Sequence, residues 1–173
     1  MTDMLAVLAD ARRSFPMRLH TSRSNVSEWN SLFVDYEKPY VERLWQNFGD
    51  GFRIYMHKIH PCQPHETFFH RHPWPSAIYV EEGVYEMLVG TGTGDQPPET
   101  GVRIILPAGS SYEMVRPNDW HSVRPHKEAS YSTFVTARPF PSWKQTPIPQ
   151  QRELTPGEAE ALYRKWVYEF YKN

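Results

Sequence analysis

The chain has 173 residues, a length typical of one domain. Nineteen Lys and Arg against 20 Asp and Glu leave a formal net charge of −1, which removes any electrostatic case for binding nucleic acid or a membrane surface. Aromatic residues make up 14% of the chain, which indicates a folded core, and 16 prolines favour short strands with stiff connections over long helices.

The single cysteine, Cys62, excludes an intramolecular disulfide framework and suits a reducing compartment. The start of the chain mixes charged and apolar residues, unlike a secretion signal. No apolar run reaches the roughly 18 residues that a transmembrane helix needs. We therefore expect a cytoplasmic protein with no membrane segment.

The N-terminal quarter is expected to begin as a helix over residues 1–15 that ends at Pro16. Residues 17–30 are polar and predicted to be irregular. Residues 32–36 and 41–48 are then predicted as edge strands, although the second could instead be a short helix.

The middle of the chain is predicted to be a series of short strands separated by turns. Residues 49–51 are a Gly-Asp-Gly turn, and residues 77–81 and 84–89 are expected to form a hairpin around Gly83. Short strands at such regular intervals are typical of a β-sandwich or barrel. The other strands are predicted at 52–59, 67–72, 102–106, 112–115, 121–124 and 131–137.

The C-terminal segment has the pattern of a helix. Thr155 and Glu158 have the spacing of a capping box, and Pro156 stands at the first helical position. An apolar stripe follows, so the sequence predicts a helix over about residues 156–171.

Two histidines one residue apart, His70 and His72, are the main chemical signal. Residues i and i+2 of a strand point to the same face, so both imidazoles can enter one interior. His121 could complete a three-point set if its own strand lies beside the first. Imidazole binds Fe, Ni, Cu and Zn alike, and an ordinary pair of polar side chains is the alternative.

This region resembles the metal-binding motifs of the cupin superfamily. Residues 70–83 are similar to the first motif, in which two His one residue apart precede a Glu and then a Gly. Residues 117–123 are similar to the second, a turn leading to a single His, with Asn118 where Gly is usual. The resemblance implies an all-β fold, the cupin double-stranded β-helix (jelly-roll) barrel, with short N- and C-terminal helices.

The resemblance also implies the organisation of the chain. We expect one cupin domain over residues 1–173, with a barrel core at about 52–137. An N-terminal extension at 1–51 and the C-terminal helix would flank it.

The resemblance makes His70, His72 and His121 the metal ligands but departs at one position. Counting back seven residues from Gly83 reaches Ser76, where most cupins carry a Glu ligand. Some cupin-like dioxygenases, the thiol dioxygenases among them, also hold iron with three His. We expect a divalent metal, with Fe(II) favoured and Zn, Ni or Mn as alternatives. Neutral ligands leave the full charge on the ion, which favours an anionic substrate.

These expectations favour a metal-dependent enzyme that acts on a small polar or anionic molecule, most directly an Fe(II)-dependent dioxygenase. Two alternatives stay open: a cupin-type isomerase of a sugar or sugar acid, and a non-catalytic cupin that binds a small molecule. An isomerase needs a general base beside a substrate carbon, and Glu66, Glu86 or His57 would have to serve.

We take Tyr79, Tyr85 and Glu66 as candidate catalytic residues, the tyrosines as pocket walls and Glu66 as an acid–base group or replacement carboxylate. The plainer alternatives are two core tyrosines and a solvated loop glutamate. Other candidate wall residues are Tyr112, Trp74 and Trp120, and candidates for clamping a substrate anion are Arg53, Arg103 and Arg124.

Apolar residues at the two ends of the chain bear on its assembly. Leu5, Leu8, Trp166 and Phe170 give both terminal helices an apolar face, and cupin-like proteins are commonly dimers. We therefore predict a homodimer. If these faces fold back on their own barrel, the chain could instead be a monomer.

Overall fold

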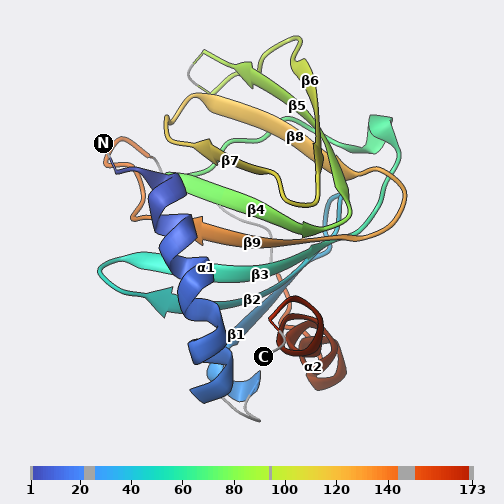
Figure 1. Ribbon diagram of the computed structural model, residues 1–173. Helices are drawn as coiled ribbons and strands as arrows, with labels where there is room; N and C mark the ends of the chain where they lie inside the picture. Colours follow the sequence, from blue (N-terminus) through green and yellow to red (C-terminus); the bar gives the residue numbers. More distant parts are fainter. Residues whose placement is uncertain (1, 22–25, 94, 144–150, 172–173) are drawn as a thin grey trace.

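Two antiparallel β-sheets pack face to face, and two helices lie on the outer side of the larger sheet (Figure 1). The structure, a computed structural model, describes residues 2–21, 26–93, 95–143 and 151–171. The larger sheet has the order β1-β2-β3-β9-β4-β7 and the smaller β6-β5-β8. This arrangement confirms the predicted all-β jelly-roll barrel. In chain order the strands are β1 (Asn30–Val34), β2 (Val41–Phe48), β3 (Phe52–Ile59), β4 (Ser76–Glu82), β5 (Val84–Thr91), β6 (Val102–Pro107), β7 (Ser111–Met114), β8 (Asp119–Pro125) and β9 (Ser130–Thr136).

The interior of the barrel is an apolar core between the two sheets. Because side chains alternate between the faces of a strand, every second residue enters this core. Ile78 and Val80 of β4 belong to one buried cluster with Tyr85 and Met87 of β5 and Phe134 of β9. The core thus joins the two sheets and supplies the inner wall from which a site can be built.

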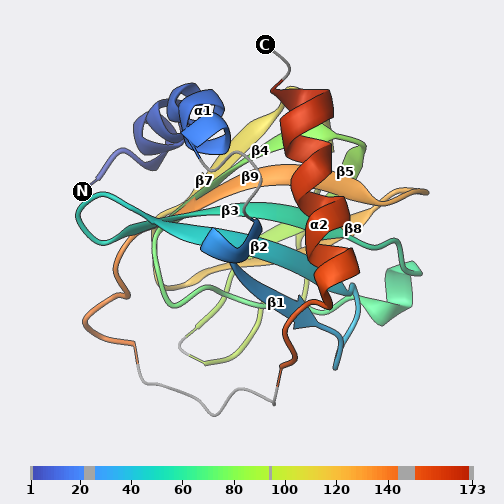
Figure 2. The same ribbon diagram turned by 90° about the horizontal axis from the view of Figure 1, so that it is seen from below.

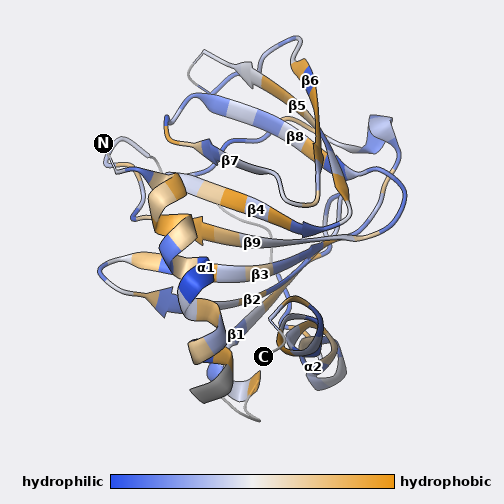
Figure 3. Ribbon diagram, viewed as in Figure 1, coloured by the Kyte–Doolittle hydropathy of each residue, from blue (hydrophilic) through white to orange (hydrophobic). Residues whose placement is uncertain are grey.

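A second apolar layer lies between the larger sheet and the helices (Figure 2). Helix α1 (Met4–Thr21) alternates hydrophobic and hydrophilic residues (Figure 3) and buries its apolar stripe. Helix α2 (Pro156–Lys165) continues into a π-helical turn (Trp166–Phe170). Two short 3-10 turns occur at Val26–Glu28 and Pro64–Glu66. The buried stripe of α1 consists of Met4, Leu8, Ala11, Phe15 and Leu19.

Helix α1 continues through Pro16, so the predicted end of this helix is wrong. A proline removes one backbone hydrogen bond and crowds the preceding turn. Phe15 and Leu19, on either side of it, are almost fully buried against the sheet, and Ser14 Oγ donates to the carbonyl of Ala11 at 2.8 Å. Tertiary packing of the apolar stripe therefore outweighs the local cost of the proline.

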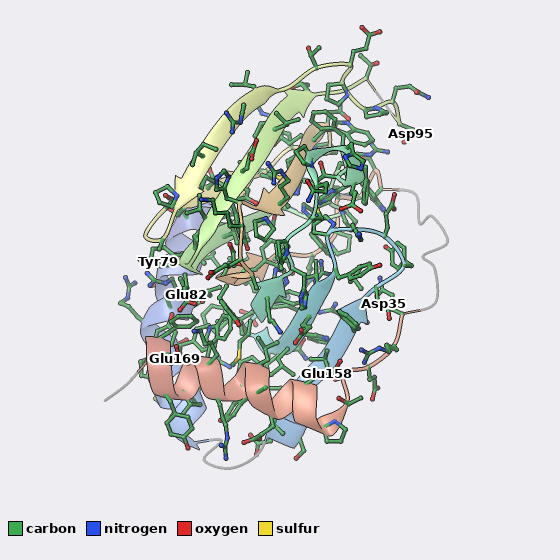
Figure 4. The ribbon with its side chains drawn as sticks, turned by 90° about the vertical axis from the view of Figure 1, so that its right-hand side faces the viewer. Asp35, Tyr79, Glu82, Asp95, Glu158 and Glu169 are labelled. Carbon is green, nitrogen blue, oxygen red and sulfur yellow. The ribbon has the colours of Figure 1, made fainter. Side chains whose placement is uncertain are left out.

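The C-terminal helix begins where the sequence predicts it. Thr155 Oγ1 accepts a hydrogen bond from the backbone N–H of Glu158, and the Glu158 carboxylate accepts one from the N–H of Thr155. This reciprocal pair is the expected capping box. Figure 4 shows Glu158 at the start of the helix, where Arg152 also pairs with its carboxylate at 2.8 Å.

The apolar ends of the chain fold back on their own sheet. Leu8 is 3% exposed and Trp166 is fully buried, both in the cluster between helices and sheet, and Phe170 packs against Trp166. Leu5 is the exception, at 39% exposed. The homodimer was expected because these apolar faces would need a partner, and most of them are covered within the chain itself. The homodimer stays a prediction.

Three predicted strands differ from the structure. Strand β2 is not an edge strand, because it pairs with both β1 and β3. Residues 67–72 form no strand, although His70 makes one isolated bridge. Strands β4 and β5 form no hairpin: β4 pairs with β7 and β9 in one sheet, whereas β5 pairs with β6 and β8 in the other.

Gly83 is the point at which the chain passes from the larger sheet to the smaller one. Its φ is +88°, a conformation that an L side chain adopts only under strain. A Cβ atom here would lie 2.9 Å from Ser130 Cβ and 3.0 Å from Ser130 Cα. A close approach of β9 therefore reinforces the conformational requirement for glycine at this crossing.

Among the described residues, no helix is both long enough and apolar enough to cross a membrane.

We expect Gly83→Ala to destabilise the protein by about 2–4 kcal/mol, because it combines positive-φ strain with overpacking against Ser130. Gly49→Ala is the matched control: its φ is +61°, but no atom lies within 4 Å of the added Cβ. That variant should lose only about 1 kcal/mol. Urea denaturation measures both, and equal losses would contradict a role for the contact with Ser130.

Candidate metal centre

Three imidazoles bring their Nε2 atoms together inside the barrel. His121 Nε2 lies 2.9 Å from His70 Nε2 and 3.0 Å from His72 Nε2. Each histidine offers one ligand nitrogen, and these three atoms lie within 4.8 Å of one another. These are the three histidines that the sequence motifs single out, and the structure brings them to one point.

Backbone pairing positions the group. His121 lies in β8, and the segment that carries the other two histidines runs beside it without forming a strand. The N–H of His70 donates to the carbonyl of His121 at 2.8 Å, and the N–H of His121 donates back at 2.9 Å. Because the segment is extended at this bridge, His72 returns to the same side as His70.

The three nitrogens cannot satisfy one another. A ring nitrogen of a neutral imidazole offers either one N–H or one lone pair. One hydrogen bond can therefore join two of the three Nε2 atoms, and the third Nε2 atom is left without a hydrogen-bond partner in the group. A cation at the centre would satisfy all three. Two nitrogens bound at right angles to one ion, each about 2.1 Å from it, lie about 3 Å apart. The observed separations of 2.9 and 3.0 Å fit this arrangement.

Burial keeps the group neutral. Loss of solvation lowers the pKa of His70 to about 4 and the pKa values of His72 and His121 well below the ordinary value for histidine. On the far side of two rings, His70 Nδ1 lies 3.4 Å from the carbonyl of Phe68 and His121 Nδ1 lies 3.4 Å from Tyr112 Oη. Partners at Nδ1 leave the Nε2 lone pairs free to bind a metal.

The three imidazoles line a cavity of about 290 Å³. Trp74 stacks on His72 with ring centroids 4.9 Å apart, and Tyr112 lies beside His121. Both were candidate wall residues and both line the cavity, whereas Trp120 does not. The wall is mainly apolar, and its hydrophobic members include Val34, Val41, Ile59, Phe68, Ile78, Val123 and Phe134.

The candidate catalytic residues lie elsewhere, and none of the three is among the described residues that line the cavity. Tyr79 faces helix α1, where the guanidinium of Arg12 stacks 3.2 Å from its ring centre (Figure 4). Tyr85 is a core residue that donates to Ser132 Oγ at 2.7 Å. Glu66 caps its own 3-10 turn and pairs with Lys38 at 2.6 Å. The two tyrosines therefore do not wall this cavity, and a catalytic role for them stays a prediction.

The predicted arginine clamp is also wrong, because another arginine lines the cavity. Arg103 and Arg124 both pair with Glu86, and Arg53 is exposed beside Trp45. The arginine in the wall besides Arg71 is Arg43 of β2. Its signal in the sequence is a charged residue placed two positions from Val41 and two from Trp45, so that it lies between two apolar residues on one face of the strand.

Comparisons with known proteins give a fold but no family. No family model matches the sequence, and no curated protein does. A solved structure of hydroxypropylphosphonic acid epoxidase from S. wedmorenis is similar, with a TM-score of 0.51 and 19% identity over 64% of this chain and 56% of that one. Fe(II)-HppE with the alternative substrate (S)-1-HPP has a TM-score of 0.53 and 17% identity, with the same coverage.

A further structure, Fe(II) HppE in complex with substrate, gives a TM-score of 0.52 at 17% identity over 64% of this chain and 57% of that one. The match therefore spans little more than half the length of these structures. At such identities the likeness shows the fold, a cupin-like barrel, and nothing finer.

We expect the wild-type chain to bind one divalent ion and His121→Ala to weaken that binding by about 100-fold or more, because it removes one of three ligands. Ser76→Ala is the matched control: Ser76 is buried at the start of β4, is not part of the histidine group and should leave affinity within about threefold. Competition for Co(II) against a chromophoric chelator measures both. A comparable loss in Ser76→Ala would overturn the three-His assignment.

Proposed function

We propose that the chain is one cupin domain and a metal-dependent enzyme, in which His70, His72 and His121 bind Fe(II) and a small polar or anionic molecule is oxidised with O₂. The observation that carries the proposal is the convergence of three neutral Nε2 atoms at the wall of a cavity. The Fe(II) named for the similar solved structures supports the choice of iron over Zn, Ni or Mn.

In this proposal the metal ligands, the stacked tryptophan and the apolar wall have different roles. The imidazoles supply three neutral donors, and Fe(II), when bound, supplies the electrons and open coordination positions that oxygen chemistry needs. Trp74 packs on His72 and holds its ring in place. The apolar wall excludes water from a substrate in the cavity, which protects reactive species from side reactions.

The ligand set bears on the choice of co-substrate. The group of three His includes no carboxylate, so the site carries one less negative charge than a site of two His and one carboxylate. We infer that the substrate itself provides the anionic donor to the metal, through a carboxylate, thiolate or enolate oxygen. On this account 2-oxoglutarate is not required.

The isomerase alternative has less support from the site. Of its three candidate bases, Glu66 pairs with Lys38 and Glu86 pairs with Arg103 and Arg124, and neither lines the cavity. Only His57 does. The binding-protein alternative requires neither metal nor turnover. Turnover measured with and without O₂ therefore separates the oxygenase, the isomerase and the binding protein.

We expect Fe(II)-loaded protein to consume O₂ when a substrate acid is added, with no dependence on 2-oxoglutarate. In His121→Ala the rate of O₂ consumption should fall at least about 1,000-fold, because the iron is no longer held. An oxygen electrode and product analysis under air and under argon measure this with a panel of small organic acids. Equal turnover under argon would favour the isomerase. Tight binding of an acid with no turnover under either gas would favour the binding protein.

A further inference from the structure

Arg43 is a cation at the wall of the cavity, and no carboxylate of the described residues forms an ion pair with it. Its Nε atom is buried and has no hydrogen-bond partner. The groups whose charge influences its pKa are Tyr55, Tyr36 and Tyr85, with no carboxylate among them. Burial lowers the pKa of Arg43, but a guanidinium titrates so far above neutrality that it remains charged. An unpaired buried charge is costly, and such groups ordinarily have a partner.

His57 lies directly opposite Arg43 on the neighbouring strand. The pair is in register between β2 and β3, and both side chains line the cavity that contains the three imidazoles. His57 is 4% exposed, and its Nε2 atom is also buried without a partner. Two residues on adjacent strands that line the cavity therefore each carry a buried nitrogen without a partner among the described residues. A ligand that accepts hydrogen bonds from both would remove both penalties.

The other charges of the cavity wall do not neutralise Arg43. Arg71 pairs with Asp95, and Glu37 is an exposed residue at the rim. His57 adds no charge, because burial holds its pKa well below the ordinary value for histidine. The interior thus holds one uncompensated positive charge, to which a bound divalent metal would add two more.

We propose that Arg43 and His57 form an oxyanion subsite that holds the acid head of the substrate while its other end reaches the three imidazoles. The guanidinium presents paired N–H donors that match a carboxylate or phosphonate, and the neutral His57 ring, with its proton on Nε2, donates one further hydrogen bond. The assignment of this ligand as the substrate rests on the proposed function, whereas the anion site itself does not.

The apolar part of the cavity wall bears on the rest of the ligand. Phe68, Trp74, Ile78 and Phe134 line the cavity, and none of these side chains offers an acceptor to a sugar hydroxyl. A polyhydroxylated molecule would lose hydrogen bonds to water there without replacement. The substrate class is therefore a small organic acid with a mainly apolar body, rather than a sugar or sugar acid.

The test uses chelator-treated protein, so that an acid cannot be held by a metal. The probes are 3-phenylpropanoate, 3-phenylpropylphosphonate and the neutral 3-phenylpropanamide, and calorimetry measures their affinity. We expect at least one acid to bind and the amide to bind at least about tenfold more weakly, since only the acid gains the charge-assisted pair. The two acids distinguish a carboxylate site from a phosphonate site.

Arg43→Met should lose at least about tenfold in affinity for the preferred acid, and its affinity for the amide should not change. The same variant should melt about 2–4 °C higher than wild type without ligand, because it removes an unpaired buried charge. A merely structural arginine would instead lower the melting temperature when replaced. Arg53→Met, a change at an exposed arginine on β3, is the matched control and should leave acid binding unchanged.

Equal affinity for acid and amide, unchanged acid binding in Arg43→Met, or no acid binding at about 10 mM would each overturn the subsite. Metal affinity, measured separately on wild type and Arg43→Met, should not fall in the variant, because loss of a nearby positive charge does not weaken the binding of a cation. If acid binding depends on Arg43 but no metal binds, the proposed function fails and the subsite stands. If metal binds but the acid does not, the subsite fails alone.

Discussion

The backbone pairing between His70 and His121 is the constraint on which the site depends. It joins a segment outside both sheets to strand β8 through two hydrogen bonds of 2.8 and 2.9 Å. Without this bridge the two histidines of the segment would belong to a loop with no fixed relation to the third. With it, three imidazoles share one point, and the stacking of Trp74 on His72 restrains the third ring.

The barrel gives this group an electrostatic setting that a surface cluster would lack. Loss of solvation holds the imidazoles neutral, and Arg43 in the cavity wall has no ion-pair partner among the described residues. In an apolar cavity each charge acts through a low effective dielectric, so its attraction for an anion is stronger than in water. The cavity that brings three imidazole nitrogens together for a cation therefore also holds a positive charge that would attract an acid.

Local sequence signals predicted those features that depend on neighbours in the chain. The strand over residues 52–59, the capping box at Thr155 and the three histidines are of this kind. The crossing at Gly83 could not be predicted, because it depends on the distant strands with which β4 and β5 pair rather than on the turn itself. The role of Arg43 was missed for a related reason: its importance comes from facing His57 across two strands, which only the register reveals.

The central claim is that His70, His72 and His121 together hold one metal ion. Anomalous diffraction from crystals grown with Fe(II) or Co(II) tests it most directly. We predict one strong peak bonded to the three Nε2 atoms at about 2.1 Å, with no side-chain carboxylate among its ligands. An ion that binds elsewhere, an ion that takes a carboxylate ligand from Glu37 or Glu66, or no peak in the cavity would contradict the account.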